Sequence, residues 1–231
     1  MVYQLTDEIT FPNPYLGDPD GLIAIGGDLS TERLLTAYQY GIFPWFPAGR
    51  TPLWFCPLDR FVIFPNEIHV SHSMRTLINS GRYRVTFNKA LRDVMDGCAE
   101  VNAGSHEKRS DDPAAWLGPQ IIEAYLEMNR IHDNVKSVEV WEGDNLVGGL
   151  YGVTSLGGFM GESMFSRVPN ASKLALISLA RQLTCSRYPS LIDCQFETSH
   201  LLSMGGRHIT YEEYLRVISS GHYTVADPRQ T

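Results

Sequence analysis

Three apolar runs that follow one another between residues 135 and 167 limit the folds open to this chain. The runs are VKSVEVWEG, NLVGGLYGVTSL and GFMGESMFSR, and the turn residues Gly143 and Asp144 separate the first two. Short apolar runs bounded by turn residues predict β-strands that pair as hairpins. Helical patterns precede and follow them, so we expect helices on a central, mostly antiparallel sheet, which is an α+β fold.

The flanking segments add further elements to this sheet. RFVIFP and YRVTFN predict strands, and LIDCQF predicts a short buried strand. Amphipathic or capped patterns predict helices in SHSMRTLINSG, KALRDVMDGCAEV, GPQIIEAYLEMNRI, NASKLALISLARQLTC and TYEEYLRVIS. Pro119 stands near the start of the third of these helices. Proline is favoured there, because the first N–H groups of a helix have no intrahelical acceptor in any case.

The first part of the chain differs from the rest, because it is rich in proline, glycine and aromatic residues. Its segment GIFPWFPAGRTPLWFCPLDR cannot form a long helix, since proline removes backbone donors. One helix is expected, TERLLTAYQYG, capped by Asp28 or Ser30 and ending at Gly41. We therefore predict a small N-terminal domain over residues 1–59 and a larger domain over residues 60–231.

The net charge and the distribution of apolar residues disfavour several classes of protein. A formal net charge of -7 shows no global basic character, although a local basic face can still bind nucleic acid. No apolar run reaches the ~18 residues that a membrane span needs. The N-terminus lacks the charged and apolar regions of a signal peptide. We expect a cytoplasmic protein with no membrane partner.

The metal-ligating residue types are scattered. The four cysteines, Cys56, Cys98, Cys185 and Cys194, form no CxxC pair, which favours free thiols in a reducing cytoplasm. The histidines show no HxxxH or HExxH spacing. We therefore expect neither a metal site nor another cofactor.

The strand LIDCQF carries an acid and an amide two residues apart. Because strand side chains alternate between faces, Asp193 and Gln195 are expected to point to one side, and Ile192 and Cys194 to the other. A carboxylate beside a carboxamide on an inner strand is a candidate for chemistry.

The run GFMGESMFSR places another acid among apolar side chains. Alternation puts Met160, Glu162 and Met164 on one face, and Phe165 could join them only through a β-bulge. Buried acids are rare unless they are paired or functional. Glu162 therefore has either an internal ion-pair partner, such as Arg167, or a functional cation. The two methionines can form a core or the wall of a pocket.

The segment that joins this strand to the next helix is SRVPNASK, which contains no glycine. Acetyltransferases of the GCN5-related type cradle the pyrophosphate of coenzyme A with a glycine-rich turn at this joint. Pro169 even removes one N–H donor. The joint therefore argues against bound coenzyme A.

Aromatic and basic residues offer a weaker signal for nucleic acid. Trp45 and its neighbours cluster near the end of the N-terminal domain, and Trp116 follows a polar loop. Such rings can stack on an unpaired base for ~1–3 kcal/mol each, although ordinary packing explains most of them. Arg75, Arg82 and Arg84 form a modest local concentration of positive charge, which a solvated helix face explains almost as well.

Taken in order, these segments resemble the bacterial leucyl/phenylalanyl-tRNA–protein transferases from about residue 10 to about residue 218. The resemblance rests on PDGLIAIGGDLSTERLLTAYQYGIFPWF, WFCPLDRFVIFP, IHVSHSM, YRVTFNKALRDVMDGCA, SVEVWEGDNLVGGLYGV, GESMFSR, NASKLAL and LIDCQ. It implies a small N-terminal domain followed by a GCN5-related acetyltransferase-like domain with a mixed, mostly antiparallel sheet, in which tRNA replaces coenzyme A as the carrier.

The resemblance also implies an activity. Enzymes of this family move leucine or phenylalanine, and less readily methionine, from aminoacyl-tRNA to the N-terminal Arg or Lys of a protein. The product carries an N-degron and is degraded. The partners would be aminoacyl-tRNA and proteins with basic N-termini, and a monomer is the default expectation.

Site residues follow from the same resemblance. Asp193 and Gln195 match the family's catalytic aspartate and glutamine. The donor is already an activated ester, so a weak base or a proton shuttle suffices for an acceptor amine whose pKa is near 8. The competing interpretation is that the pair only orients the substrates while the terminal ribose hydroxyl of the tRNA moves the proton.

The other roles are implied in the same way. Glu162 would hold the donor's ammonium group, while Met160, Met164 and Phe165 would line the pocket for its side chain. The terminal adenosine would be bound by aromatic residues, which are Trp45, Trp116, Tyr38 and Tyr125. The acceptor stem would meet Arg75, Arg82 and Arg84. The acid that holds the basic side chain of the acceptor does not follow from the resemblance, and Glu197, just past the DCQ motif, is a candidate from its position alone.

Three alternatives remain open at this stage. One is a coenzyme A-dependent N-acetyltransferase on the same fold, which the glycine-free joint disfavours. Another is a non-catalytic module that binds basic N-termini, for which Asp193 and Gln195 would be dispensable. The last is a structural RNA-binding protein, against which the net charge of -7 argues.

Overall fold

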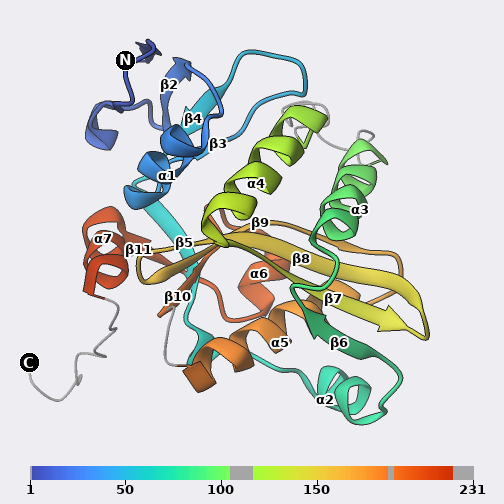
Figure 1. The fold of residues 1–231 in the computed structure, drawn as a ribbon. Helices are drawn as coiled ribbons and strands as arrows, with labels where there is room; N and C mark the ends of the chain where they lie inside the picture. Colours follow the sequence, from blue (N-terminus) through green and yellow to red (C-terminus); the bar gives the residue numbers. More distant parts are fainter. Residues whose placement is uncertain (1, 105–116, 187–189, 221–231) are drawn as a thin grey trace, which may run out of the picture.

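Two sheets organise the chain (Figure 1). The computed structural model describes residues 2–104, 117–186 and 190–220. The smaller sheet has the order β1-β2-β4-β3 and lies within the N-terminal part of the chain. Its strands are β1 (Tyr3–Leu5), β2 (Leu22–Gly26), β3 (Phe43–Pro44) and β4 (Leu53–Phe55).

The larger sheet has seven strands in the order β11-β5-β10-β9-β8-β7-β6. Its neighbours are antiparallel except for β9 and β10, which run parallel. The strands are β5 (Asp59–Ile63), β6 (Arg84–Phe87), β7 (Val135–Glu142), β8 (Asn145–Ser155), β9 (Gly158–Ser166), β10 (Leu191–Asp193) and β11 (Arg207–Thr210). The expected α+β fold with a mixed, mostly antiparallel sheet is confirmed.

Helices lie on both faces of the larger sheet. In Figure 1, α3 and α4 cover one face, and α5 runs beneath the other. The helices are α1 (Thr31–Gln39), α2 (His72–Asn79), α3 (Leu91–Gly104), α4 (Pro119–His132), α5 (Ala171–Ser186), α6 (Ser199–Ser203) and α7 (Tyr211–Ser220), with short 3-10 turns η1 (Pro14–Leu16) and η2 (Pro65–Glu67). Pro119 opens α4 as predicted, and the Ser30 side chain caps α1 by accepting from the N–H of Arg33.

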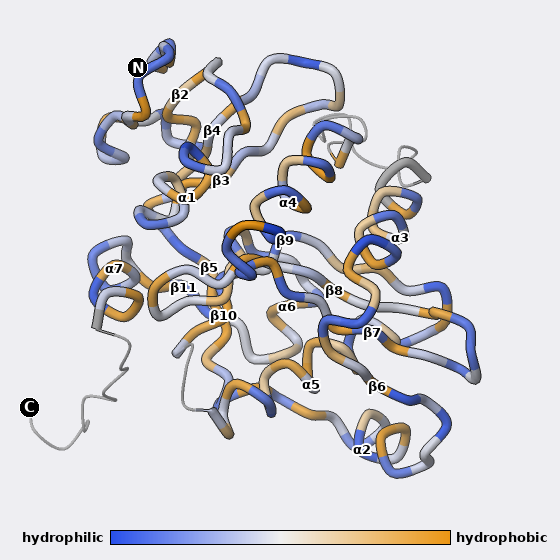
Figure 2. The backbone as a smooth tube through the Cα atoms, in the orientation of Figure 1, coloured by the Kyte–Doolittle hydropathy of each residue, from blue (hydrophilic) through white to orange (hydrophobic). Residues whose placement is uncertain are grey.

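The buried residues form two clusters, one on each face of the larger sheet. The first joins the N-terminal sheet, α1, α4 and α7 to β8 and β9, and the second lies under α5, α2 and α6. Figure 2 shows hydrophilic and hydrophobic segments alternating along α3 and α4, as expected for helices with one face on a sheet. The N-terminal part therefore shares its core with the rest of the described chain.

The sequence prediction was wrong in detail near the C-terminus. The strand predicted for LIDCQF ends at Asp193, because Gln195 has a φ of 58° and cannot continue an extended strand. Helix α6 and strand β11 were not predicted. Both are short, at 5 and 4 residues, and elements of that length carry little periodicity.

A fully buried acid on β7 holds the start of α3. Glu139 accepts hydrogen bonds from the hydroxyls of Ser137 and Thr86 and from the backbone N–H groups of Lys89 and Ala90. Its exposed fraction is 0 %. A buried carboxylate needs this many hydrogen-bond donors, since burying a charge without partners costs free energy of folding.

We expect Glu139→Ala to lower the free energy of unfolding by about 3 kcal/mol, because it leaves several buried donors without an acceptor. Urea unfolding followed by far-UV circular dichroism measures the change. Glu142→Ala is the matched control, since Glu142 lies on the same strand but pairs with Arg82 at the surface. That control should cost less than about 1 kcal/mol. Equal losses in the two variants would contradict a structural role for Glu139.

Candidate active site

A bulge in β9 positions Glu162. Tyr151 of β8 pairs with Ser163 and Gly152 pairs with Gly161, so Glu162 is an extra residue between two paired positions. An extra residue in one strand shifts the alternation of side chains beyond it. The bulge therefore decides which residues share a face with Glu162.

The methionines do not share one face, contrary to the sequence prediction. Met160 and Phe165 are both buried in the core cluster that contains Tyr38 and Tyr125. Met164 packs against the opposite cluster. The bulge that Phe165 needed in order to join Met160 is therefore present, and it turns Met164 away from both.

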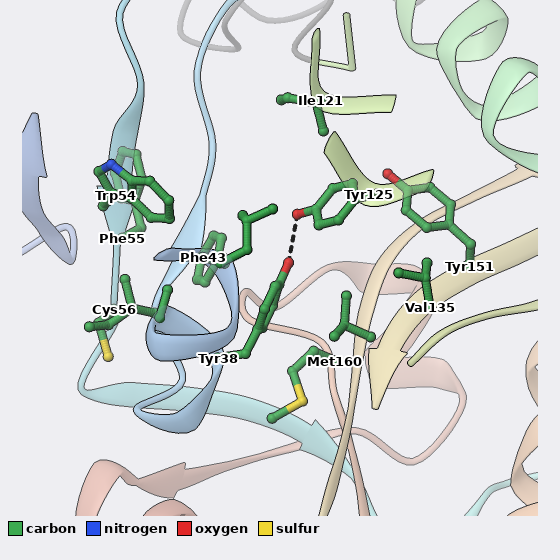
Figure 3. Packing of buried hydrophobic residues seen from close by; sticks show 14 of the residues in the cluster. Tyr38, Phe43, Trp54, Phe55, Cys56, Ile121, Tyr125, Val135, Tyr151 and Met160 are labelled. Carbon is green, nitrogen blue, oxygen red and sulfur yellow. Dashed lines mark hydrogen bonds between the residues drawn. The ribbon is translucent and has the colours of Figure 1, made fainter. Parts of the chain in front are cut away.

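Two buried tyrosines hold the Glu162 carboxylate. Tyr38 of α1 donates to Oε1 at 2.7 Å, and Tyr125 of α4 donates to Oε2 at 3.1 Å. The two hydroxyls also meet each other at 2.6 Å, as the dashed line in Figure 3 shows. Desolvation raises the pKa of Glu162 to about 7, although the two hydroxyls act in the opposite direction. Desolvation likewise raises the pKa of each tyrosine well above its ordinary value.

A cavity of about 440 Å³ opens beside Glu162, next to the point at which β10 ends. Its polar lining includes Glu162, Gln195 and His200. Apolar side chains from β8, β9, β10, α5 and α6 form the other walls. They are Leu150, Phe159, Met164, Leu176, Leu179, Ile192 and Leu201. The arrangement can take up an apolar side chain and present a carboxylate and a carboxamide to its polar end.

Asp193 does not line this cavity. It is fully buried, and its carboxylate accepts from the guanidinium of Arg60 and from the hydroxyl of Tyr214. It also accepts from the backbone N–H of Gln195 at 2.9 Å. Asp193 and Gln195 are therefore linked, but through the main chain and not as neighbours on one strand face.

The conformation of Gln195 places it at the cavity. Its φ of 58° lies in the left-handed region, which L-residues rarely adopt. The backbone around it is held by Phe61, whose carbonyl accepts from the N–H of Cys194 at 2.9 Å and whose N–H donates to the Gln195 carbonyl at 3.4 Å. The side chain of Gln195 is 9 % exposed and lines the cavity.

An aromatic ledge of Trp45, Phe43, Phe55 and Phe196 adjoins Gln195. The ring of Trp45 lies 5.4 Å from that of Phe55 and 5.6 Å from that of Phe196. Trp45 is half-buried and Phe196 is 36 % exposed, so the ledge offers ring surface to a ligand. Phe196 was not singled out from the sequence, although its position directly after Gln195 was a usable signal. Trp116 lies outside the described residues.

The predicted basic residues lie on the surface, away from the cavity lining. Arg75, on α2, donates to the carbonyl of Val70. Arg82 pairs with Glu142, and Arg84 of β6 lies 5.3 Å over the ring of Trp141. All three arginines are exposed.

Residues 2–104, 117–186 and 190–220 contain no group of three His, Cys, Asp or Glu side chains placed to hold a metal ion. Over the same residues, no helix has the length and apolar character needed to cross a membrane.

Comparison with known proteins identifies the family. The profile of the family described as Leucyl/phenylalanyl-tRNA protein transferase matches residues 62–219, and the profile of its N-terminal domain matches residues 27–58. The chain belongs to the leucyl/phenylalanyl-tRNA–protein transferase family. This confirms the resemblance expected from the sequence.

Similar proteins with that name cover nearly the whole chain. The transferase of Flavobacterium psychrophilum is 48% identical over 214 residues, which are 93% of this chain and 98% of the relative. The transferase of Syntrophobacter fumaroxidans is 44% identical over 218 residues, or 94% of this chain and 90% of the relative. A third, from Flavobacterium johnsoniae, is 43% identical and is covered along 100% of its length.

The raised pKa of Glu162 predicts a pH-dependent contribution to stability. Its pKa is about 7 in the folded protein against an ordinary value of 4.5. The folded state therefore holds this proton more tightly, and the resulting stabilisation is present in acid and lost as the pH rises through 7. Between pH 5 and pH 8 the wild type should lose roughly 2 kcal/mol relative to Glu162→Gln.

Urea unfolding of both proteins at the two pH values measures this difference. Glu142→Gln, measured in the same way, controls for the loss of an exposed carboxylate elsewhere. An identical pH dependence of wild type and Glu162→Gln would show that the Glu162 carboxyl is not desolvated.

Proposed function

We propose that this chain transfers leucine or phenylalanine, and less readily methionine, from aminoacyl-tRNA to the N-terminal Arg or Lys of acceptor proteins. The product would carry an N-degron and be degraded. The observation that carries the proposal is that Glu162 and Gln195 line one apolar cavity in a chain that matches the transferase family along most of its length.

Glu162 binds the ammonium group of the donor amino acid in this proposal. The carboxylate stands at the cavity with a tyrosine hydroxyl on each oxygen, which fixes its direction. The apolar walls take the donor side chain. They exclude β-branched side chains by shape, and such discrimination is worth only about 1–3 kcal/mol. Met164 belongs to the walls, whereas Met160 and Phe165 are buried in the core cluster and do not line the cavity.

Gln195 receives the acceptor amine. Its carboxamide oxygen can accept a hydrogen bond from the α-amine of the acceptor. The amine nitrogen then attacks the ester carbonyl, so that a C–N bond forms and the C–O bond to the tRNA ribose breaks. The proton leaves the amine and ends on the ribose oxygen, and the products are the extended protein and deacylated tRNA. Positioning the two reactants supplies much of the rate enhancement.

The tRNA lies along the ledge and the basic surface. Trp45 stacks on the terminal adenine, with Trp116 as its predicted counterpart from the segment outside the described residues. Tyr38 and Tyr125 are each 1 % exposed, so their contribution to this site is to hold Glu162 rather than to stack. The exposed Arg75, Arg82 and Arg84 contact acceptor-stem phosphates, which position the tRNA without reading its sequence.

The scaffold proposed for these roles is a small N-terminal domain over residues 1–59 and a GCN5-related acetyltransferase-like domain over residues 60–231, acting as a monomer in the cytoplasm. The parallel pairing of β9 and β10 within the larger sheet and the cavity at the end of that pair support this assignment. The joint between β9 and α5, which lacks glycine, favours a carrier other than coenzyme A.

The decisive assay follows labelled Phe from Phe-tRNA into a peptide with an N-terminal Arg. Wild type should transfer the label, and Gln195→Ala should lower kcat by about 100-fold or more, as expected for loss of the group that positions the acceptor amine. Gln182→Ala, an exposed glutamine on α5, is the matched control and should retain full activity. The proposal fails if folded wild type transfers no label from intact Phe-tRNA.

The same preparation separates the alternative functions. Saturable binding of coenzyme A would favour an N-acetyltransferase. Retained binding of Arg-peptides by Gln195→Ala, together with no transfer by the wild type, would favour a peptide-binding module.

Glu197 is proposed to hold the basic side chain of the acceptor, because it lies two residues from Gln195 and its carboxylate is half-exposed. Its Oε2 lies 2.8 Å from Nε2 of His208. Loss of one charge-assisted contact predicts that Glu197→Gln raises the KM for the Arg-peptide by about 10-fold. The KM for Phe-tRNA should stay constant.

Glu123→Gln removes another exposed, ion-paired carboxylate on α4 and is the control. Initial rates at varied peptide concentration give the comparison. An unchanged peptide KM in Glu197→Gln would assign the acceptor side chain to another residue.

A further inference from the structure

A buried cation lies behind the Gln195 backbone. Arg60 of β5 is 1 % exposed, and its Nε donates to Oδ1 of Asp193 at 2.9 Å while Nη2 donates to Oδ2. This fork-to-fork pairing holds the carboxylate in one plane, which a single point charge cannot do.

Aromatic rings hold the guanidinium in turn. Its central carbon lies 5.3 Å from the ring centroid of Phe43 and 4.7 Å from that of Tyr214, both within the range of a cation–π contact. The Tyr214 hydroxyl also donates to Oδ2 of Asp193 at 2.9 Å. Residues from β3, β5, β10 and α7 therefore meet at one buried ion pair.

Hydrogen bonds within the protein occupy both oxygens of the Asp193 carboxylate. Oδ1 accepts from Arg60 and from the backbone N–H of Gln195, and Oδ2 accepts from Arg60 and from Tyr214. Since the side chain is also 0 % exposed, it is not available to a substrate proton. What it holds is the main chain of Gln195.

That main chain needs an anchor. A residue other than glycine in the left-handed region costs roughly 1–2 kcal/mol, and it keeps that conformation only where its surroundings impose it. The hydrogen bond from the Gln195 N–H to Asp193 supplies such a constraint at 2.9 Å. The direction of the Gln195 side chain into the cavity depends on the same backbone angles.

We propose that Arg60 is a positioning residue of this transferase, which through its bidentate pair with Asp193 fixes the left-handed backbone of Gln195 and so aims the carboxamide into the cavity. The inference rests on the proposed role of Gln195. It assigns Asp193 to positioning as well, because the Asp193 carboxylate meets Gln195 only at its N–H.

Arg60→Lys is the first test, since it keeps the positive charge and removes the fork. The kcat for Phe transfer should fall by about 100-fold, as misplaced catalytic groups commonly cost that much. The KM for Phe-tRNA should change by less than about threefold, because Glu162 and the cavity are untouched. In a Gln195→Ala background, Arg60→Lys should cause no further loss of kcat, since both changes disable the same group.

Two further variants complete the design. Tyr214→Phe removes only one hydroxyl from the same carboxylate and should lower kcat by about 10-fold, so it serves if Arg60→Lys does not fold. Arg33→Lys is the matched control, since Arg33 is also a fully buried arginine but contacts Asp28 and the carbonyls of Thr6 and Glu8 in the N-terminal part. Its kcat should equal that of the wild type.

Hydrogen–deuterium exchange of a peptide covering Gln195 gives a readout that does not depend on activity. Protection of the Gln195 amide should fall in Arg60→Lys and Tyr214→Phe but not in Arg33→Lys. Unchanged protection of the Gln195 amide would overturn the positioning role. The role would also be overturned if Arg60→Lys lowered kcat equally with and without Gln195, or if Arg60→Lys and Tyr214→Phe both folded and kept full activity. Absence of transfer by the wild type would instead overturn the proposed function, while the exchange experiment would still decide the role of Arg60.

Discussion

The buried pair of Arg60 and Asp193 is the interaction on which the rest of the site depends. A carboxylate removed from water is tolerated only when it is closely matched, and here the fork of Arg60 and the hydroxyl of Tyr214 supply that match for Asp193. The pair ties β5 to β10 and brings α7 and β3 against them. The carboxylate of Asp193 also accepts a hydrogen bond from the N–H of Gln195. The hydrogen bonds that satisfy this buried charge therefore also fix the backbone beside the cavity.

The second constraint is the difference between the two strands that flank the cavity. β9 continues to Ser166, whereas its parallel neighbour β10 ends at Asp193. Beyond that point β9 bulges at Glu162, and the chain after β10 turns through Gln195 toward α6. Both strands depart from regular pairing at one place, and residues of both strands line the cavity there. Burial of Glu162 at this place raises the pKa of its carboxyl group, and a cationic group bound beside it would favour the charged form.

Much of the fold could be predicted from the sequence, and the exceptions have physical causes. The hairpin strands β7, β8 and β9 and the long helices carry sustained periodicity and clear caps, so their existence was predictable. The short β11 and α6 lack both and exist because neighbouring elements hold them. Asp193, Gln195 and Glu162 could be singled out from the sequence because they are polar residues within apolar runs. Arg60 was not, because nothing local distinguishes a buried arginine from a surface one, and Glu139 was missed for the same reason.

The sequence by itself determined the class of fold, the family and the residues that stand out chemically, because these depend on patterns within short segments. Only the tertiary structure decided how those residues are used. It separated Asp193 from the cavity and turned Met164 away from Met160, since the end of a strand and a bulge change side-chain direction without leaving a pattern in the sequence. It also brought Arg60 to Asp193 and Tyr38 to Glu162 across 133 and 124 positions of chain. Such long-range pairs form because buried charges and hydroxyls must find partners, and packing of the whole chain selects which ones.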